Sequence, residues 1–197
     1  MNSLVIGVLA LQGAFAKHAE MLRSLGVKVI EVRKPEELES CDGLVIPGGE
    51  STTMFKQMKF VDFVDPFRKF SQQKPVFGTC AGLILMSEKI IGDEMQPFHL
   101  IDVQVQRNAF GRQAESFQTE VDLQLPSKPI QQVPAIFIRA PKICQLGDQV
   151  NVLATLNGEP VLVRQSKHLG ATFHPELTGN STIHAFFLTL VRQKKMQ

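Results

Sequence analysis

The first half of the sequence alternates short apolar runs with longer amphipathic segments, and this alternation restricts the fold more than any other feature. The runs expected to form strands are residues 4–11, 27–32, 43–49 and 75–78. The segments expected to form helices are residues 14–26, 51–58, 64–73 and 81–90. Because strands joined by helices form right-handed crossovers, the pattern predicts an α/β fold with a mostly parallel sheet and helices on both faces.

In the second half of the sequence the apolar runs are separated by shorter segments than in the first half. Strands are expected at residues 103–107, 119–125, 135–140, 150–156, 161–165 and 169–175. The Asn157-Gly158 turn predicts a hairpin between Val152 and Arg164. An amphipathic helix is expected at residues 181–193. With no repeat or linker, residues 1–197 are expected to form a single three-layer, flavodoxin-like domain with a smaller antiparallel β element in its C-terminal half.

Composition excludes several classes of function. The chain has 197 residues and a net charge of +2, with both signs mixed along it, so nothing favours binding to nucleic acid or to a membrane surface. Its three cysteines, Cys41, Cys80 and Cys144, lie far apart without metal-binding spacing. No Lys or Arg precedes the first apolar run, and Gln12-Gly13 interrupts it, so no signal peptide is expected. We therefore expect a cytoplasmic protein without disulfides, bound metal or membrane span.

The segment Phe77–Gly82, FGTCAG, places Cys80 between a strand and a helix with glycines on both sides. Such glycines allow the sharp turn that raises a nucleophile above the C-terminal edge of a sheet. A helix start favours the thiolate, and the N–H of Ala81 would face a developing oxyanion. The alternative is a buried structural cysteine at the start of a core helix.

A nucleophilic cysteine requires a base and a group that orients the base. His174 ends the apolar run at 169–173, and Glu176 lies two residues further on, where it can reach back to the imidazole. His184 is expected to be packed or at the surface, His99 and His168 to lie in loops, and His18 to face either way. His174 and Glu176 are therefore the predicted partners of Cys80.

A third motif, PGGES at Pro47–Ser51, also follows a strand. Its adjacent glycines expose backbone N–H groups and permit a peptide flip, so Gly49 can supply a second oxyanion donor. The motif is neither a dinucleotide fingerprint nor a Walker loop. An ordinary Gly-Gly turn is the alternative.

In the order PGGES, GTCAG and HPE, these motifs resemble the class I, triad-type glutamine amidotransferases. Further segments resemble the glutaminase subunits of pyridoxal 5′-phosphate synthase, and these are IGVLALQGAF, PGGESTTM, FGTCAGLILM, QRNAFGRQAESF, FIRAP and FHPELT, spanning Ile6 to Thr178. The resemblance implies the class I amidotransferase fold and an enzyme that hydrolyses L-glutamine and delivers ammonia to a synthase subunit within a large hetero-oligomeric assembly. It implies no cofactor.

The resemblance also implies roles for particular residues. Cys80 would form a γ-glutamyl thioester, His174 would move protons, Glu176 would orient His174, and Gly49 and Ala81 would hold the oxyanion. The residues that match the family's glutamine contacts are Gly49, Glu50, Ser51, Arg107, Ile138 and Arg139. An arginine can bind the substrate carboxylate through paired hydrogen bonds, although a salt-bridged surface arginine is the alternative.

Partner contact is expected at the first helix and the loop before it, where Gln12, Lys17 and His18 are the candidates. The family often has an acidic residue at the position of Lys17. This difference puts the affinity of the chain for its synthase partner in question. We expect the glutaminase to depend on its partner: the Gly48–Gly49 peptide would rest flipped, and Gln12 would relay the contact that corrects it.

Other functions remain open at this stage. The chain could be a class I glutaminase serving a different synthase, a stand-alone γ-glutamyl hydrolase, or another cysteine hydrolase on a similar sheet. The hydrolases usually carry a larger pocket-forming insertion, for which this chain lacks room. A catalytically inactive binding subunit would normally have lost Cys80, His174 or Glu176, and all three are present.

Overall fold

The computed structural model describes residues 3–107 and 116–196. Its centre is a nine-stranded mixed sheet in the order β2-β1-β3-β4-β12-β11-β10-β7-β8. The bounds in that order are Lys28–Val32, Val5–Leu9, Gly43–Ile46, Val76–Thr79, His168–Ala171, Glu159–Gln165, Asn151–Leu156, Ser116–Leu123 and Gln131–Ile138. The strands from β2 to β12 pair in parallel, and those from β12 to β8 pair antiparallel. A second sheet contains β5 (Lys89–Ile90), β6 (Val103–Gln106) and β9 (Lys142–Leu146) in that order.

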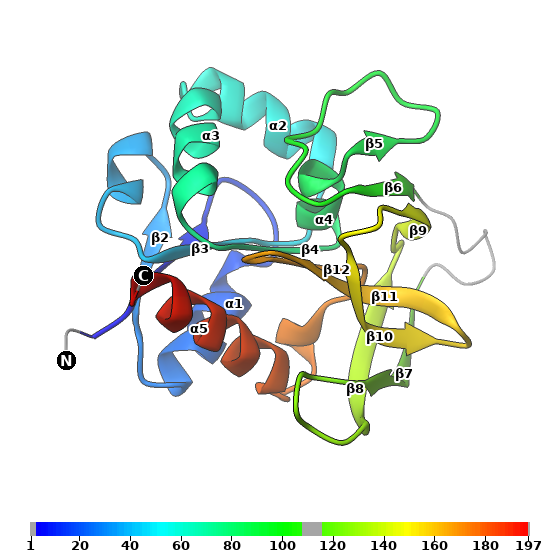
Figure 1. Ribbon diagram of the computed structural model, residues 1–197. Coiled ribbons are helices and arrows are strands. Elements are labelled where there is room, and N and C mark those ends of the chain that lie inside the picture. Colours follow the sequence, from blue (N-terminus) through cyan, green and yellow to red (C-terminus); the bar gives the residue numbers. More distant parts are fainter. Residues whose placement is uncertain (1–2, 108–115, 197) are drawn as a thin grey trace.

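Helices cover both faces of the parallel half, as Figure 1 shows. Helices α1 (Phe15–Ser24) and α5 (Thr182–Lys195) lie on one face; α2 (Ser51–Phe60), α3 (Val64–Gln73) and α4 (Ala81–Met86) lie on the other. Two short 3-10 helices, η1 (Pro35–Leu38) and η2 (Pro175–Leu177), complete the regular structure of the described residues. The α/β class and the three layers predicted from sequence are confirmed.

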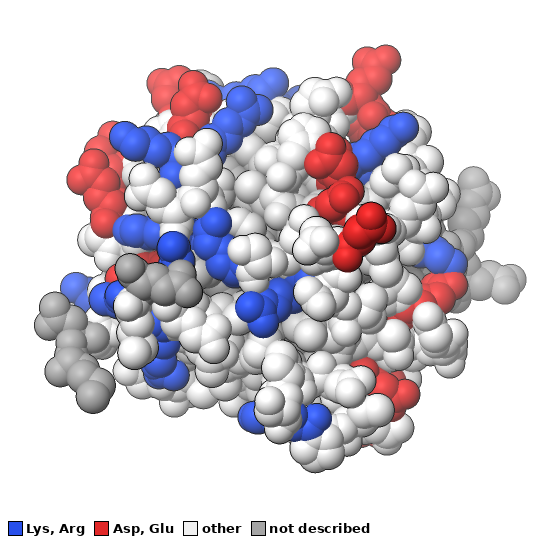
Figure 2. Space-filling model, viewed as in Figure 1, with Lys and Arg blue, Asp and Glu red and all other residues white. Residues whose placement is uncertain are grey.

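Each face of the sheet has its own apolar core. One contains Leu22 of α1 and Phe187 of α5, and the other contains Met54 of α2 and Phe67 of α3, all four fully buried. Figure 2 shows both signs of charge among uncharged residues on the surface in view. No helix among the described residues is long and apolar enough to cross a membrane.

The second half differs from expectation in several places. The antiparallel strands continue the main sheet through the β11–β12 pair, where a smaller element was expected. The predicted β10–β11 hairpin is present, with Asn151 opposite Arg164. Strand β9 was not predicted, because its short sequence KICQL does not alternate apolar and polar residues. His168 lies in strand β12 and is buried, so its expected place in a loop was wrong.

The helix expected at residues 81–90 ends at Met86. Ser87 adopts an extended conformation, and its hydroxyl donates a hydrogen bond of 2.8 Å to the carbonyl of Ile84. The N–H of Glu88 then donates to the carbonyl of Val103, which begins the pairing of β5 with β6. A serine that bonds to its own last turn ends the helix early, because it satisfies a carbonyl that further helix would have used.

Candidate active site

Cys80 occupies a strained turn between β4 and α4. Its backbone has φ 48° and ψ −102°, a conformation that a non-glycine residue adopts only where its surroundings enforce it. The flanking glycines make room for the turn. A Cβ atom at Gly78 would lie 2.6 Å from the carbonyl carbon of Gly82, and one at Gly82 would lie 2.2 Å from the carbonyl oxygen of Ile46. The glycine spacing is therefore required by close backbone packing around the cysteine.

His174 and Glu176 lie beyond the end of β12, the neighbour of β4 in the sheet. The N–H of His174 donates to the carbonyl of Ile136 at 2.8 Å, and its ring Nδ1 lies 2.8 Å from Oε1 of Glu176. Burial of the ring opposes the imidazolium. Hydrogen bonds to Cys80 and Glu176, with the charges of both, outweigh burial and raise the pKa of His174 to about 10. The structure thus brings the three predicted catalytic residues together.

Glu176 is fully buried and remains a carboxylate. Burial by itself raises its pKa, but contacts with His18 and His174 lower it below the ordinary value. A buried carboxylate beside an imidazole fixes the ring's tautomer and stabilises its protonated form. This is the geometry expected of an orienting group.

The Gly48–Gly49 peptide follows β3 and lies beside His174. The carbonyl of Gly48 accepts a hydrogen bond of 3.3 Å from the N–H of Ala14. Because the peptide is trans, the N–H of Gly49 points away from the loop that contains Ala14. The carbonyl of Gly48 thus faces this loop, and the flipped resting state expected from sequence stays a prediction. The other expected oxyanion donor, Ala81, is the first residue of α4, where backbone N–H groups lack intrahelical acceptors.

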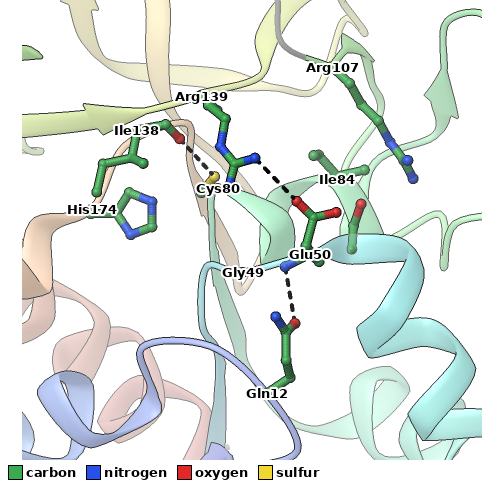
Figure 3. Close-up of a pocket in the computed structure, with 10 residues that line it drawn as sticks. Gln12, Gly49, Glu50, Cys80, Ile84, Arg107, Ile138, Arg139 and His174 are labelled. Atoms are coloured by element: carbon green, nitrogen blue, oxygen red, sulfur yellow. Dashed lines mark hydrogen bonds and ion pairs between the residues drawn. The ribbon is translucent and has the colours of Figure 1, made fainter. Parts of the chain in front are cut away.

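A pocket of about 220 Å³ opens in front of Cys80. Its lining residues are Gln12, Gly49, Glu50, Ser51, Cys80, Ile84, Arg107, Ile138, Arg139 and His174. All six predicted glutamine contacts are among them, whereas Ile84 was not predicted (Figure 3). The thiol of Cys80 lies 3.8 Å from the carbonyl oxygen of Ile138, to which it can donate. A pocket of this size, with charged groups at its rim, suits a small polar molecule.

The two arginines of the pocket are already partly engaged. Arg107 Nη1 lies 3.0 Å from Oδ2 of Asp93 and 2.9 Å from Oγ1 of Thr52. Its Nε is buried and has no hydrogen-bond partner among the described residues. Arg139 has φ 42° and lies 3.8 Å from the carboxylate of Glu50, with both side chains exposed. Sequence did not reveal Asp93, which lies in an irregular segment without a motif.

The three candidates for partner contact have different surroundings. Gln12 lines the pocket, and its Oε1 accepts a 3.0 Å hydrogen bond from the N–H of Glu50 (Figure 3). Lys17 is exposed and pairs with Glu20 at 3.0 Å. His18 is fully buried, which corrects the expectation that its side chain meets a partner. Within the described ranges, no group of three or more His, Cys, Asp or Glu side chains is placed to hold a metal ion.

A cysteine on a strained strand–helix turn lies beside a histidine–glutamate pair from the next parallel strand and a small polar pocket, and this arrangement fits a class I glutamine amidotransferase. The model of the SNO glutamine amidotransferase family matches residues 8–193, and the chain belongs to this family.

Two relatives and a solved structure of 44% identity agree with this family. The pyridoxal 5′-phosphate synthase subunit PdxT of Niallia circulans is 49% identical over 191 residues, covering 96% of this chain and 99% of the relative. PdxT of Thermosipho africanus is 49% identical over 189 residues, covering 95% and 99%. A crystal structure of a glutamine amidotransferase has a TM-score of 0.88 at 44% identity, covering 95% of this chain and 98% of that one. PurLQS from Thermotoga maritima shares the fold alone, with a TM-score of 0.66 at 13% identity over 99% of this chain and 98% of that one.

Proposed function

We propose that this chain is the glutaminase subunit of a pyridoxal 5′-phosphate synthase. It hydrolyses L-glutamine to L-glutamate and ammonia and delivers the ammonia to the synthase subunit, in the biosynthesis of vitamin B6. The observation that carries the proposal is that Cys80 and His174 line one pocket and Glu176 contacts the ring of His174, in a chain that belongs to the SNO family. The three cysteines are free, as expected for a protein of the reducing cytoplasm.

The chemistry follows from this geometry. The thiolate of Cys80 attacks the side-chain amide carbon of glutamine, and the carbonyl oxygen becomes an oxyanion that the N–H groups of Gly49 and Ala81 stabilise. The imidazolium of His174 gives its proton to the leaving nitrogen, ammonia departs, and a γ-glutamyl thioester remains on the sulfur. His174 then takes a proton from water, the resulting hydroxide attacks the thioester, and glutamate is released. Glu176 orients His174 throughout and stabilises its positive charge.

The pocket also offers partners for the amino-acid end of glutamine. Arg107 lines the pocket, and its guanidinium can bind the substrate carboxylate while Asp93 contacts Nη1. Glu50 can attract the ammonium group, and Arg139 can contribute a second cation at the rim. Ser51 and the backbone of Ile138 complete the proposed contacts.

Partner control is proposed to act through Gln12. This side chain lies in the loop before α1, lines the pocket, and holds the backbone of Glu50 beside Gly49. A synthase subunit that contacts the loop can therefore alter the oxyanion loop without a large movement. Replacing Gln12 with Ala should reduce glutamate release by the complex, since it removes this hydrogen bond.

The proposal is tested by glutamate release from the full chain, alone and with the synthase subunit, together with pyridoxal 5′-phosphate formation by the complex. Glutamate release that rises on adding the synthase, and that Cys80→Ala abolishes, is the expected result. Glutamate release without pyridoxal 5′-phosphate would indicate a different synthase. Hydrolysis of γ-glutamyl peptides in preference to glutamine would indicate a stand-alone γ-glutamyl hydrolase.

A further inference from the structure

A buried polar cluster lies behind the catalytic residues, away from the pocket. His18 of α1, His184 of α5 and Thr79 of β4 are all fully buried. His18 Nδ1 lies 2.8 Å from His184 Nε2, and His18 Nε2 lies 3.1 Å from Thr79 Oγ1. The same Nε2 lies 3.3 Å from Oε2 of Glu176. The cluster therefore contacts the carboxylate oxygen that His174 does not use.

The hydrogen-bonding direction of this cluster follows from its chemistry. A carboxylate oxygen can only accept hydrogen bonds. The tautomer of His18 with a proton on Nε2, the nitrogen that faces Oε2 of Glu176, is therefore favoured. Burial lowers the pKa of His18; the charge of Glu176 opposes this effect and His174 adds to it. His18 is therefore neutral, so its Nδ1 carries no proton and accepts a hydrogen bond from the N–H of His184 Nε2.

The outer end of the cluster supports the same direction. His184 Nδ1 is buried and has no hydrogen-bond partner among the described residues. Burial, and secondarily His18, lowers the pKa of His184, so this ring is neutral as well. When the proton of His184 is on Nε2, the nitrogen without a partner is Nδ1, which carries no proton. The opposite tautomers would bury an N–H without an acceptor and turn a lone pair of His18 toward the carboxylate, and both changes are unfavourable.

We propose that His18, held in place by His184, is a positioning residue of the glutaminase site that fixes the outer oxygen of Glu176 so that the inner oxygen stays on His174. No hydrogen bond from the described residues reaches Oε2 of Glu176, and the N–H of His18 lies between Oε2 and Thr79. Without His18, Oε2 would lose its 3.3 Å contact with the ring Nε2, and the carboxylate could turn away from His174. This inference rests on the proposed function.

The test compares two polar substitutions of His18 in the full chain with its synthase partner. The amide of His18→Gln reaches the position of Nε2 and can still donate to Glu176, whereas the shorter amide of His18→Asn reaches only the position of Nδ1. We expect kcat for glutamine to fall about tenfold in His18→Asn, because a buried charged oxygen then loses the ring N–H that faces it, and to stay near wild type in His18→Gln. KM should be unchanged in both, since neither side chain lines the pocket.

The control and the double substitution separate positioning from general damage. His168 is another buried histidine, remote from the triad's contacts, so His168→Asn should lower thermal stability and leave kcat unchanged. In a Glu176→Gln background, His18→Asn should cost little further activity, because the group it positions is already altered. If the His18 variants do not fold, His184→Gln, which keeps a donor toward His18, and His184→Leu, which removes it, make the same comparison.

Equal kcat values for His18→Gln and His18→Asn, with wild-type activity intact, would overturn the role of His18 and leave the proposed function standing. A full tenfold loss in the Glu176→Gln background would also overturn it, because His18 would then act independently of Glu176. Absence of glutamate release from the wild-type complex would instead refute the proposed function. In that case the rate at which iodoacetamide alkylates Cys80 compares the His18 variants without glutamine, and equal rates would overturn the positioning role.

Discussion

Replacing Gly48 with Ala should disable the active site by displacing His174. A Cβ atom at this position would lie 2.2 Å from Cε1 of His174 and 2.9 Å from its Nδ1. Carbon atoms in contact normally lie about 3.5–4.0 Å apart, so the ring must move by about 1 Å or more. The 2.8 Å hydrogen bond from Nδ1 to Glu176 cannot survive that movement in its present geometry.

A misplacement of about 1 Å in a catalytic group costs on the order of 100-fold in rate, or about 2.7 kcal/mol in the activation free energy. The assay is kcat for glutamate release by the complex, with thermal unfolding measured on the same samples. Gly43→Ala is the matched control, because its Cβ would lie 2.8 Å from Val191 in the core. It should cost about 1–3 kcal/mol of stability while kcat stays near wild type. A Gly48→Ala enzyme with wild-type kcat would refute the placing of His174 in the machinery.

Three further predictions concern binding, catalysis and stability. Arg107→Ala should raise KM for glutamine about 10-fold or more while Arg68→Ala, outside the pocket, leaves it unchanged; equal effects would make Arg107 structural. Glu176→Gln should lower kcat less than His174→Asn does, because it orients without moving protons; a loss as large as that of His174→Asn would contradict this role. Burial, and secondarily Lys167, lowers the pKa of His168 from 6.5 to about 4, so the folded state loses roughly 3 kcal/mol as pH falls from about 6.5 to about 4. Chemical denaturation of His168→Gln should show a correspondingly smaller loss, and an unchanged loss would contradict this source.

The sequence was enough to predict that Cys80 and His174 lie close together. Gly78 and Gly82 mark a turn that only close backbone packing explains, and His174 ends an apolar run. Parallel strands bring their C-terminal ends to one edge of a sheet, so residues that follow β4 and β12 must lie close together. Local sequence and topology therefore determine the meeting of Cys80 with His174.

The buried contact between His18 and His184, behind the catalytic residues, could not be predicted in this way. His18 and His184 lie 166 residues apart on two helices, and their contact depends on how α1 and α5 rotate against the sheet. The helical periodicity around His18 does not determine whether its side chain points into the core or toward solvent. The engagement of Arg107 by Asp93 and the early end of α4 at Ser87 likewise depend on tertiary contacts or on single side-chain hydrogen bonds. None of these leaves a motif in the sequence.

The most direct test of the account is to trap the covalent intermediate. The complex would be quenched with acid while it turns over glutamine and then digested. Mass spectrometry would examine the peptides that contain the three cysteines of this chain. The account predicts a γ-glutamyl adduct on Cys80, and none on the buried Cys41 or the exposed Cys144. In Cys80→Ala both the adduct and glutamate release should disappear. An adduct on another cysteine, or glutamate release that persists in Cys80→Ala, would contradict the assignment of Cys80 as the nucleophile.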